Sequence, residues 1–504
     1  MTAFDADHSF AVMMRQTNIQ QVAIGFLFLC AGAAIRFHHL DGQSLWNDEM
    51  FSMDVGKLAF TEIQPQLIAH YHHPPLFFYL LHFVFAAMGQ SAWSLRLISA
   101  LSGSLTIGIV FYVAASLFGN RAGVVAGVIS LFSPFHLAYS QEGRPYALAA
   151  LLALLSCMFF VRLLQERTRS RMFFYCVATI ALLYTHHWGI FVAFAQFLYA
   201  LVVARSDHTL KKYVIGMAIV IGFSYVPELY ALYRQSAGHG SDSWFWAESP
   251  SAFEVVRVAE AFSGSYFKMA SSIFDSPAAV RILGALAIGA SCLMAIDAAF
   301  RHRQNIALQG FLFCCCAGLM IPFGLSFVKP EIFLWYRYTI IIYPVVCVLI
   351  GAMAMLGRWK AIALGSVAVL MAVSAYGTVR YFSWSKSNAR DVARYVQEVG
   401  RDTVKILIRP AYVAPLLNYY YSGVAVQLDE AYLNTTLGEI VDTAHSFIYI
   451  SLDAPNEIRQ YMDGHFEKVA EKEFPGEAHM GMIVGFYRQR PEPDDSSSSG
   501  VEEQ

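Results

Sequence analysis

Two adjacent carboxylates, Asp48 and Glu49, lie in the stretch SLWNDEMFS (residues 44–52), shortly after a long apolar run. A carboxylate held beside a hydroxyl group can accept its proton and so activate it as a nucleophile, which is general-base catalysis. The pair could also be ordinary loop charge that keeps the segment soluble. The choice depends on what the rest of the chain places around these two residues.

Three arginines lie where apolar runs end, each in a short polar stretch. Arg96 lies in WSLRLISA, Arg144 follows Glu142 in YSQEGRPYAL, and Arg337 follows Tyr336 in FLWYRYTIIIYP. A single interfacial arginine often only reaches toward lipid headgroups, and tyrosines at span ends commonly form an aromatic belt. As a group, however, charges at a membrane interface tend to be paired and functional. We therefore predict that these residues form a binding site for an anion beside the acidic pair.

Histidines form two further candidate groups. His70, His72 and His73 lead into HPPL, and imidazole is a common metal ligand. Their spacing matches no metal motif, so we expect no obligatory metal or other cofactor, although a divalent cation could take part. His186 and His187, in YTHHWG, are interpreted as residues of a turn between two spans rather than as ligands. Of these five, only His73 is assigned to the substrate-binding set.

The composition is that of a membrane protein. Of 504 residues, 57% are hydrophobic and only 14% are charged, and the mean hydropathy is +0.46. Soluble domains carry about 25% charged residues, so we predict an integral membrane protein. The net charge of −2 gives no signature of nucleic-acid binding, and the eight cysteines show no spacing typical of disulfide frameworks or zinc sites. The first apolar run lacks a small-residue cleavage site and is expected to be retained as a span.

Apolar runs predict the spans, since a helix needs about 20 apolar residues to cross the hydrocarbon core. Runs of this kind lie near residues 20–37, 94–117, 122–139, 145–163, 172–187, 188–204, 213–233, 278–299, 307–328, 335–357 and 361–379. A shorter run, 76–89, is expected to enter the membrane without crossing it, so the fold class is an α-helical polytopic membrane protein with about 11–13 transmembrane helices. An arrangement in which 76–89 crosses stays open.

Basic residues predict the orientation. Lys and Arg gather in the loops near 118–122, 162–172, 205–212, 300–306 and 358–360. The positive-inside rule places such loops in the cytoplasm. The N-terminus is then inside, whereas the loop 38–75 and everything after residue 380 are outside.

The chain changes character after its last apolar run. Residues 1–380 form the predicted transmembrane domain, and residues 385–490 alternate helical and strand-like patterns typical of a small α/β domain. The tail, 491–504, is of low complexity and is expected to be disordered. We find no internal repeat of the type that builds inverted-repeat transporters.

The motifs, in their order, resemble a known family. LWNDEMFS, HPPL, LRLISAL, SQEGRPYAL and RYTIIIYP are similar to the polyprenyl-phosphate-dependent glycosyltransferases of the GT-C superfamily, especially protein O-mannosyltransferase-like enzymes and lipid A aminoarabinose transferases. The resemblance extends over about residues 20–350 and leaves out the C-terminal domain. It implies a GT-C-type fold, Asp48 as the catalytic base, and His73 and Arg96 in the donor site. The aminoarabinose transferases have a lysine where this chain has His73.

The resemblance and the predicted topology together imply one reaction. A single sugar would pass, with inversion, from a polyprenyl-phosphate donor to a hydroxyl of a glycan, lipid or protein on the periplasmic face of a bacterial inner membrane. The arginines would hold the donor phosphate and stabilise the charge that develops on the leaving group. The carboxylate would take the proton of the acceptor hydroxyl.

Two alternatives share the membrane and the lipid-linked substrate. A transporter or flippase would place its key charges near the bilayer midplane between repeats, whereas the charges here lie at the ends of spans. An oligosaccharide polymerase or ligase would use the same class of lipid donor and would differ in the size of the group transferred.

Overall fold

The computed structural model describes residues 3–70, 73–238, 250–269, 272–400, 405–410, 413–421, 425–427, 446–452, 457–474 and 481–490. His72 and the predicted disordered tail, 491–504, lie outside these residues. The chain divides into two compact units. The first consists of Met1–Gly42, Phe51–Met269 and Ile273–Trp384, and the second of Gln43–Met50, Ala270–Ser272 and Ser385–Gln504.

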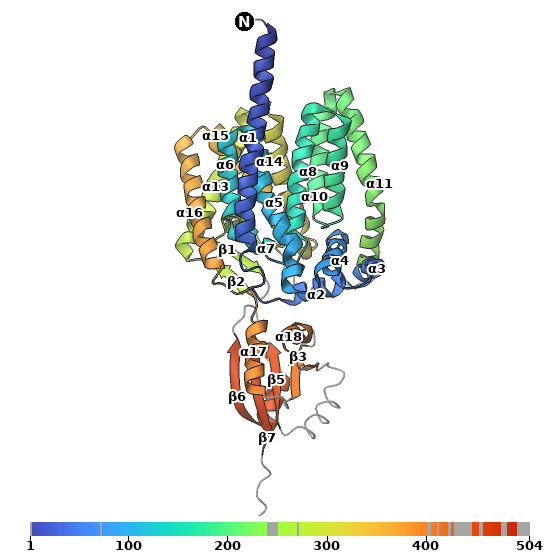
Figure 1. Ribbon diagram of the computed structural model, residues 1–504, viewed down its shortest axis with the longest axis vertical. Helices are drawn as coiled ribbons and strands as arrows, with labels where there is room; N and C mark the ends of the chain where they lie inside the picture. Colours follow the sequence, from blue (N-terminus) through green and yellow to red (C-terminus); the bar gives the residue numbers. More distant parts are fainter. Residues whose placement is uncertain are drawn as a thin grey trace, which may run out of the picture. The chain divides into compact units, whose positions relative to one another are not determined.

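The first unit is built from helices that pack side by side (Figure 1). Its helices are α1 (Ala3–Phe37), α3 (Phe60–His70), α4 (Leu76–Met88), α5 (Ala92–Phe118), α6 (Asn120–Leu131), α7 (Pro134–Ser140), α8 (Tyr146–Glu166), α9 (Arg169–Leu183), α10 (Gly189–Val203), α11 (His208–Gly238), α12 (Glu254–Ser263), α13 (Ala278–Arg301), α14 (Ile306–Leu325), α15 (Tyr343–Leu356) and α16 (Lys360–Tyr381). Two short strands, β1 (Tyr266–Met269) and β2 (Ser272–Asp275), pair between α12 and α13. Helix α2 (Asn47–Gly56) contains residues of both units.

Eight of the described helices are long and apolar enough to cross a membrane, or nine if the bent pair α6–α7 counts as one span. The predicted fold class, a helical polytopic membrane protein, is therefore confirmed, whereas the predicted number of about 11–13 spans exceeds the eight or nine found among the described helices. The predicted spans 172–187 and 335–357 correspond to the shorter helices α9 and α15, of 15 and 14 residues. Both predicted spans were longer than the helices. The apolar runs also included the turn after α9 and the 3₁₀ segment Tyr338–Ile341 before α15.

Helix α4 is short, as the sequence predicts. Its 13 residues rise about 20 Å at 1.5 Å per residue. The hydrocarbon core is about 30 Å thick. A straight α4 is therefore too short to cross it.

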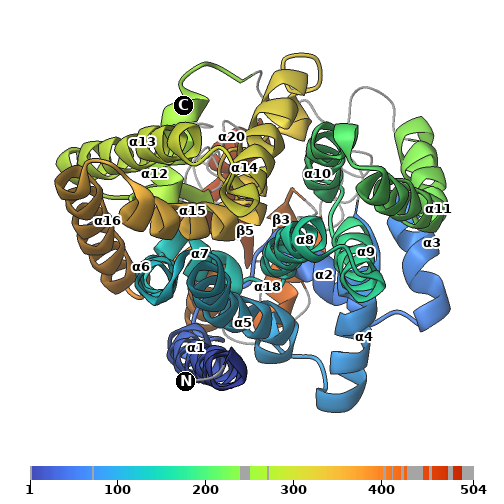
Figure 2. The same cartoon turned by 90° about the horizontal axis from the view of Figure 1, so that it is seen from above.

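Helix α15 lies at the centre of the first unit, between α13 and α14 on one side and α6 and α7 on the other (Figure 2). Every side chain from Tyr343 to Ala354 is buried. Close approach of α6 requires a glycine on α15, because a Cβ at Gly351 would lie 2.4 Å from the Ala122 carbonyl oxygen. The apolar composition of α15 thus reflects burial among other helices.

The chain bends by 63° between α6 and α7, and the cause is local. Pro134 follows the break and cannot continue a helix, while the Ser133 hydroxyl accepts a hydrogen bond from the His136 N–H and caps the new one. The last carbonyls of α6 lose their helical partners at the break. The Arg36 guanidinium takes their place, donating to the carbonyls of Ser130 at 3.1 Å and Leu131 at 3.2 Å.

The second unit contains a five-stranded mixed sheet in the order β4-β3-β5-β7-β6. Its strands are β3 (Lys405–Arg409), β4 (Ala425–Gln427), β5 (Ser446–Leu452), β6 (Phe466–Phe474) and β7 (Met482–Gln489), and its helices are α17 (Ala389–Gly400), α18 (Ala414–Tyr420) and α20 (Glu457–His465). Strand β3 runs parallel to β4 and β5, and β7 runs antiparallel to β5 and β6. The predicted strand-like runs VKILI, SFIYISL and GMIVGFY are β3, β5 and β7.

Candidate active site

The turn between α7 and α8 carries Arg144 and is fixed to two other helices. The Gln141 side-chain amide donates to the carbonyls of Arg36, at 3.0 Å, and His38, at 2.8 Å, at the end of α1. The Ser99 hydroxyl of α5 donates to the Arg144 carbonyl at 3.0 Å. These bonds hold the backbone of the turn, so the arginine side chain starts from a defined point.

Glu142 lies in the same turn and is almost completely buried, with 1% of its surface exposed. Its carbonyl accepts the Arg144 N–H at 2.7 Å. Gly143, between them, is needed for close packing, because a Cβ there would lie 2.4 Å from the Leu95 side chain. The sequence EGR is therefore a tightly built turn that presents an arginine.

The Arg144 guanidinium is buried among side chains from three segments. Nη2 donates to His73 Nε2 at 2.6 Å, and Nη1 donates to the Ser52 hydroxyl at 3.2 Å. The guanidinium carbon lies 5.2 Å from the centre of the Phe51 ring and 5.9 Å from that of Tyr146. Such stacking holds the planar group in one orientation.

The contact with Arg144 also fixes the state of His73. A guanidinium can only donate hydrogen bonds, so His73 Nε2 is the acceptor and the ring is neutral, with its proton on Nδ1. Burial, together with the nearby Arg144 charge, holds the pKa of His73 well below its usual range. His73 therefore orients the arginine as a neutral ring and adds no positive charge to the site.

The acidic pair opens helix α2, where carboxylates are favourable near the helix N-terminus. Glu49 is fully buried and forms an ion pair with the Lys386 ammonium at 2.8 Å, which is also buried. The Tyr420 hydroxyl accepts a hydrogen bond from the Leu45 N–H at 2.7 Å and so ties the start of this segment to α18. Asp48 is only half-buried. The Glu49 charge is thus engaged by Lys386, and Asp48 is the better candidate for a base.

The other two arginines have different surroundings. Arg96 is fully buried and its Nη1 donates to the Leu40 carbonyl at 2.8 Å, so it does not extend to lipid headgroups. Arg337 is half-buried, with its guanidinium carbon 5.8 Å from the centre of the Tyr336 ring. The Tyr336 carbonyl accepts the Tyr139 hydroxyl and thereby connects this loop to α7.

The structure brings some of the predicted residues into direct contact and separates the roles of others. Arg144 and His73 touch, although 71 positions separate them in the chain. Sequence reasoning missed Ser52 as a partner of Arg144 and Lys386 as the partner of Glu49. The only sequence signal for Lys386 is its place as the one lysine in SWSKSN, between the last span and the C-terminal domain.

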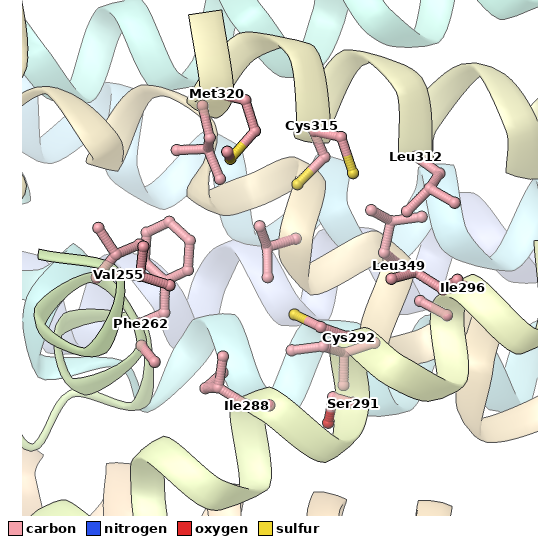
Figure 3. Close-up of a pocket in the computed structure, with 18 of the residues that line it drawn as sticks. Val255, Phe262, Ile288, Ser291, Cys292, Ile296, Leu312, Cys315, Met320 and Leu349 are labelled. Carbon is pink, nitrogen blue, oxygen red and sulfur yellow. The ribbon is translucent and has the colours of Figure 1, made fainter. Parts of the chain in front are cut away.

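An apolar cavity of about 290 Å³ lies between α12, α13, α14 and α15 (Figure 3). Its walls are formed almost entirely by hydrocarbon and sulfur-containing side chains, including those of Val255, Phe262, Ile288, Leu312, Met320 and Leu349. Phe333 also lines it and lies in the same loop as Tyr336 and Arg337. One short loop therefore leads from the cavity to Arg337.

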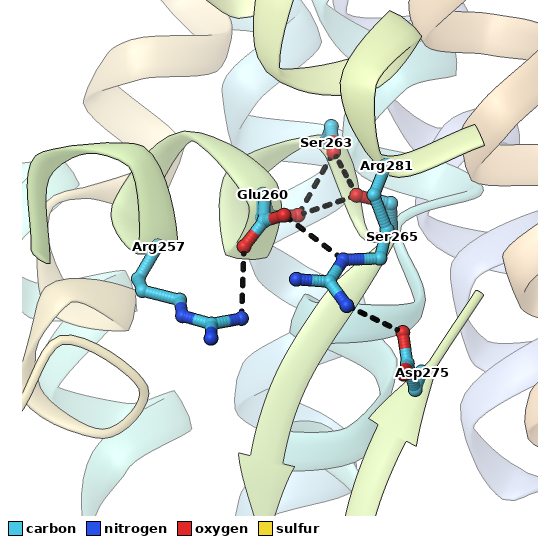
Figure 4. Close-up of polar contacts among 6 residues, drawn as sticks. All are labelled: Arg257, Glu260, Ser263, Ser265, Asp275 and Arg281. Atoms are coloured by element: carbon cyan, nitrogen blue, oxygen red, sulfur yellow. Dashed lines mark hydrogen bonds and ion pairs between the residues drawn. The ribbon is translucent and has the colours of Figure 1, made fainter. Parts of the chain in front are cut away.

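A polar cluster fixes helix α12, which forms one wall of this cavity (Figure 4). The Glu260 carboxylate accepts from Arg257 at 3.2 Å and from Arg281 at 2.9 Å, and Arg281 also contacts Asp275 at 3.1 Å. The Tyr266 ring lies 4.2 Å from each of the two guanidinium carbons. We interpret the cluster as structural, because its charges are largely paired with one another.

Metal binding finds no support among the described residues, where no group of three or more His, Cys, Asp or Glu side chains could hold a metal ion. His72 falls outside that set of residues.

Comparison with known proteins agrees with this architecture. Residues 72–230 match the family described as dolichyl-phosphate-mannose-protein mannosyltransferase. The structure is similar to that of ArnT from Cupriavidus metallidurans, both bound to undecaprenyl phosphate (TM-score 0.60, 14% identity) and in the apo state (0.60, 15%), with 92% of this chain and 97% of the other covered in each case. An oligosaccharyltransferase from Archaeoglobus fulgidus is also similar (TM-score 0.49, 13% identity, covering 84% of this chain and 68% of the other). No curated protein sequence matches the chain.

The matched segment, residues 72–230, and the fold are both similar to membrane glycosyltransferases of the GT-C type. The resemblance seen in the sequence motifs is thereby confirmed.

Proposed function

We propose that this protein transfers one sugar, with inversion, from a polyprenyl-phosphate donor to an acceptor hydroxyl on the outer face of the membrane. The observation that carries the proposal is the Arg144 site. A buried guanidinium is oriented by His73 and by Ser52, and Ser52 lies one turn after Asp48 in helix α2. A phosphate ligand beside a carboxylate base is what such a reaction requires.

The apolar cavity supports a lipid-linked donor. Its volume, about 290 Å³, is close to the lower end for ligand pockets, and its lining suits part of a polyprenyl chain rather than a sugar. The loop from Phe333 to Tyr338 runs from the cavity to aromatic contacts with His186 and Tyr146 beside Arg144. The lipid of a donor could therefore occupy the cavity while its phosphate lies near Arg337 and Arg144. The ArnT structure bound to undecaprenyl phosphate is consistent with this class of donor.

The proposed reaction is a single displacement. The acceptor oxygen attacks the anomeric carbon as its proton passes to the Asp48 carboxylate, and the bond from that carbon to the phosphate oxygen breaks. The electron pair of the broken bond stays on the phosphate, which leaves as polyprenyl phosphate. Arg144 and Arg337 stabilise the added charge through charge-assisted hydrogen bonds.

Replacement of Asp48 by Asn tests the assignment of the base, because it keeps the size of the side chain and removes the proton acceptor. General-base contributions are about 10²–10⁴-fold. We expect a drop of that size in kcat for purified, folded Asp48→Asn protein. Glu49→Gln is the comparison, and we expect it to reduce stability rather than kcat. An Asp48→Asn enzyme with wild-type turnover would show that the base lies elsewhere.

Orientation is tested by labelling cysteines placed one at a time in a background without exposed native cysteines. We expect a cysteine at Lys57 to react from outside in intact cells, and one at Arg303 to react only after permeabilisation. The reverse pattern would move the reaction to the cytoplasmic face.

The mass of the product separates this function from that of a polymerase or ligase. We expect addition of one sugar per turnover, and transfer of a preassembled chain would refute the single-sugar proposal.

A further inference from the structure

The turn between α9 and α10 holds His186 in a fixed geometry. Its N–H donates to the Leu182 carbonyl at 3.0 Å, and its carbonyl accepts the Gly189 N–H at 2.9 Å. A Cβ at Gly189 would lie 2.7 Å from the Leu182 side chain, so the turn is closely packed. The sequence correctly predicts a turn here, but the turn alone does not explain what the imidazole does.

Hydrogen bonding determines which ring nitrogen of His186 carries the proton. The backbone N–H of Trp188 points at His186 Nδ1 from 3.1 Å. A backbone N–H can only donate, so Nδ1 must be an acceptor and the proton of the neutral ring is on Nε2. His186 therefore presents an N–H donor on the edge opposite to the Trp188 backbone.

The Nε2–H donor is buried and has no hydrogen-bond partner among the described residues. His186 is 6% exposed. Leaving a buried donor unpaired is costly in free energy, and such a group needs an explanation. A ligand that brings an acceptor to Nε2 would supply one.

The surroundings of His186 indicate what kind of acceptor this is. Its ring centre lies 5.1 Å from that of Tyr338, 5.5 Å from that of Tyr146 and 6.1 Å from that of His73. Two of these rings also belong to the Arg144 site, since Tyr146 lies beneath the guanidinium and His73 accepts its hydrogen bond. Arg337 directly precedes Tyr338 in the chain. The unpaired donor thus lies among groups that would attract an anion.

We propose that His186 binds the donor substrate through its Nε2–H, which donates a hydrogen bond to a phosphate oxygen of the polyprenyl phosphate. The inference rests on the proposed function and adds a contact to it. Because the same oxygen gains charge when the sugar leaves, the bond strengthens in the transition state.

The hydrogen bond comes from a neutral ring. Burial, reinforced by the neighbouring His187 and Arg144, lowers the pKa of His186 to about 3. The imidazole is therefore a neutral ring and not an imidazolium at neutral pH. Its contribution to binding should not change between pH 6 and pH 8. This separates a neutral donor from a cationic phosphate ligand.

Binding of undecaprenyl phosphate to the full-length protein in nanodiscs tests the inference without knowledge of the sugar or the acceptor. His186→Leu removes the donor, whereas His186→Gln places an amide N–H near the same position. His208→Leu is the matched control, because His208 is exposed at the start of α11. Thermal unfolding of each variant shows whether the fold is intact.

We expect His186→Leu to raise Kd about tenfold to a hundredfold, as for loss of a hydrogen bond to a charged group. His186→Gln should bind within about threefold of wild type, and His208→Leu should bind as wild type does. The ratio of Kd values for His186→Leu and wild type should be equal at pH 6 and pH 8. Equal binding by His186→Leu and wild type, Gln as weak as Leu, or a ratio that grows at pH 6 would each overturn the inference. Failure of the wild type itself to bind undecaprenyl phosphate would instead overturn the proposed function.

Discussion

Replacement of Arg144 by Lys tests whether the site depends on the planar shape of the guanidinium group or only on its positive charge. Lysine keeps the positive charge, but its single ammonium cannot replace a planar group that donates to His73 at 2.6 Å and to Ser52 at 3.2 Å while it stacks on Phe51. At least one of these hydrogen bonds is lost, and one buried partner is left unpaired. Such a loss costs about 1–3 kcal/mol. We therefore expect kcat/KM for the donor to fall about tenfold to a hundredfold.

The assay is steady-state transfer by purified protein with the donor varied at saturating acceptor. Arg169→Lys is the matched control, since Arg169 is exposed at the start of α9, and it should retain wild-type kinetics. The acceptor KM should change little, because Arg144 is assigned to the donor phosphate. An Arg144→Lys enzyme within about twofold of wild type would show that Arg144 is only a structural cation.

The remaining predictions concern stability. Glu49→Gln and Lys386→Met should each destabilise the protein by about 3–5 kcal/mol, because each leaves a buried charge unpaired, and the double variant should lose less than the sum; additive losses in thermal unfolding would contradict this. Arg36→Met should lower the unfolding temperature, because two carbonyls at the end of α6 lose their donor, and an unchanged midpoint would show that water replaces the guanidinium. The low pKa of His186, about 3, means that the unfolded state binds the extra proton below pH 6.5, so stability is lost as the pH falls, by about 2 kcal/mol at pH 5. His186→Gln should lose correspondingly less stability between pH 7 and pH 5, and an acid response equal to that of wild type would refute the assignment.

The membrane fold could be predicted because lipid imposes a one-dimensional pattern. Long apolar runs must be helices in the hydrocarbon core, so the runs marked the helices, including the short α4. The pattern was less informative where an apolar segment is buried against protein rather than lipid. Residues Tyr338–Ile341 are as apolar as a span but form a 3₁₀ turn, and the break before Pro134 lies within a run that reads as one helix.

The candidate site was less accessible to sequence reasoning, because its contacts join distant positions. The spacing of His73 and Arg144 gives no indication that one accepts a hydrogen bond from the other. Glu49, in α2, and Lys386, in the segment after α16, are still further apart in the chain. His186 was correctly placed in a turn, yet its unpaired Nε2–H depends on a backbone N–H two residues away.

The buried arginines differ in their hydrogen-bond partners. This difference indicates which of them is best suited to bind the donor phosphate. Arg36 and Arg96 donate to backbone carbonyls, at the end of α6 and at Leu40 respectively, and so hold the shape of the chain. Two hydrogen bonds of the Arg144 guanidinium instead go to side chains, those of Ser52 and His73, which can reorient when a ligand arrives. A guanidinium that holds backbone in place cannot turn to a phosphate without breaking that structure. We therefore assign the donor phosphate first to Arg144, and regard Arg96, which has the stronger motif in the sequence, as the residue that positions the segment before α2.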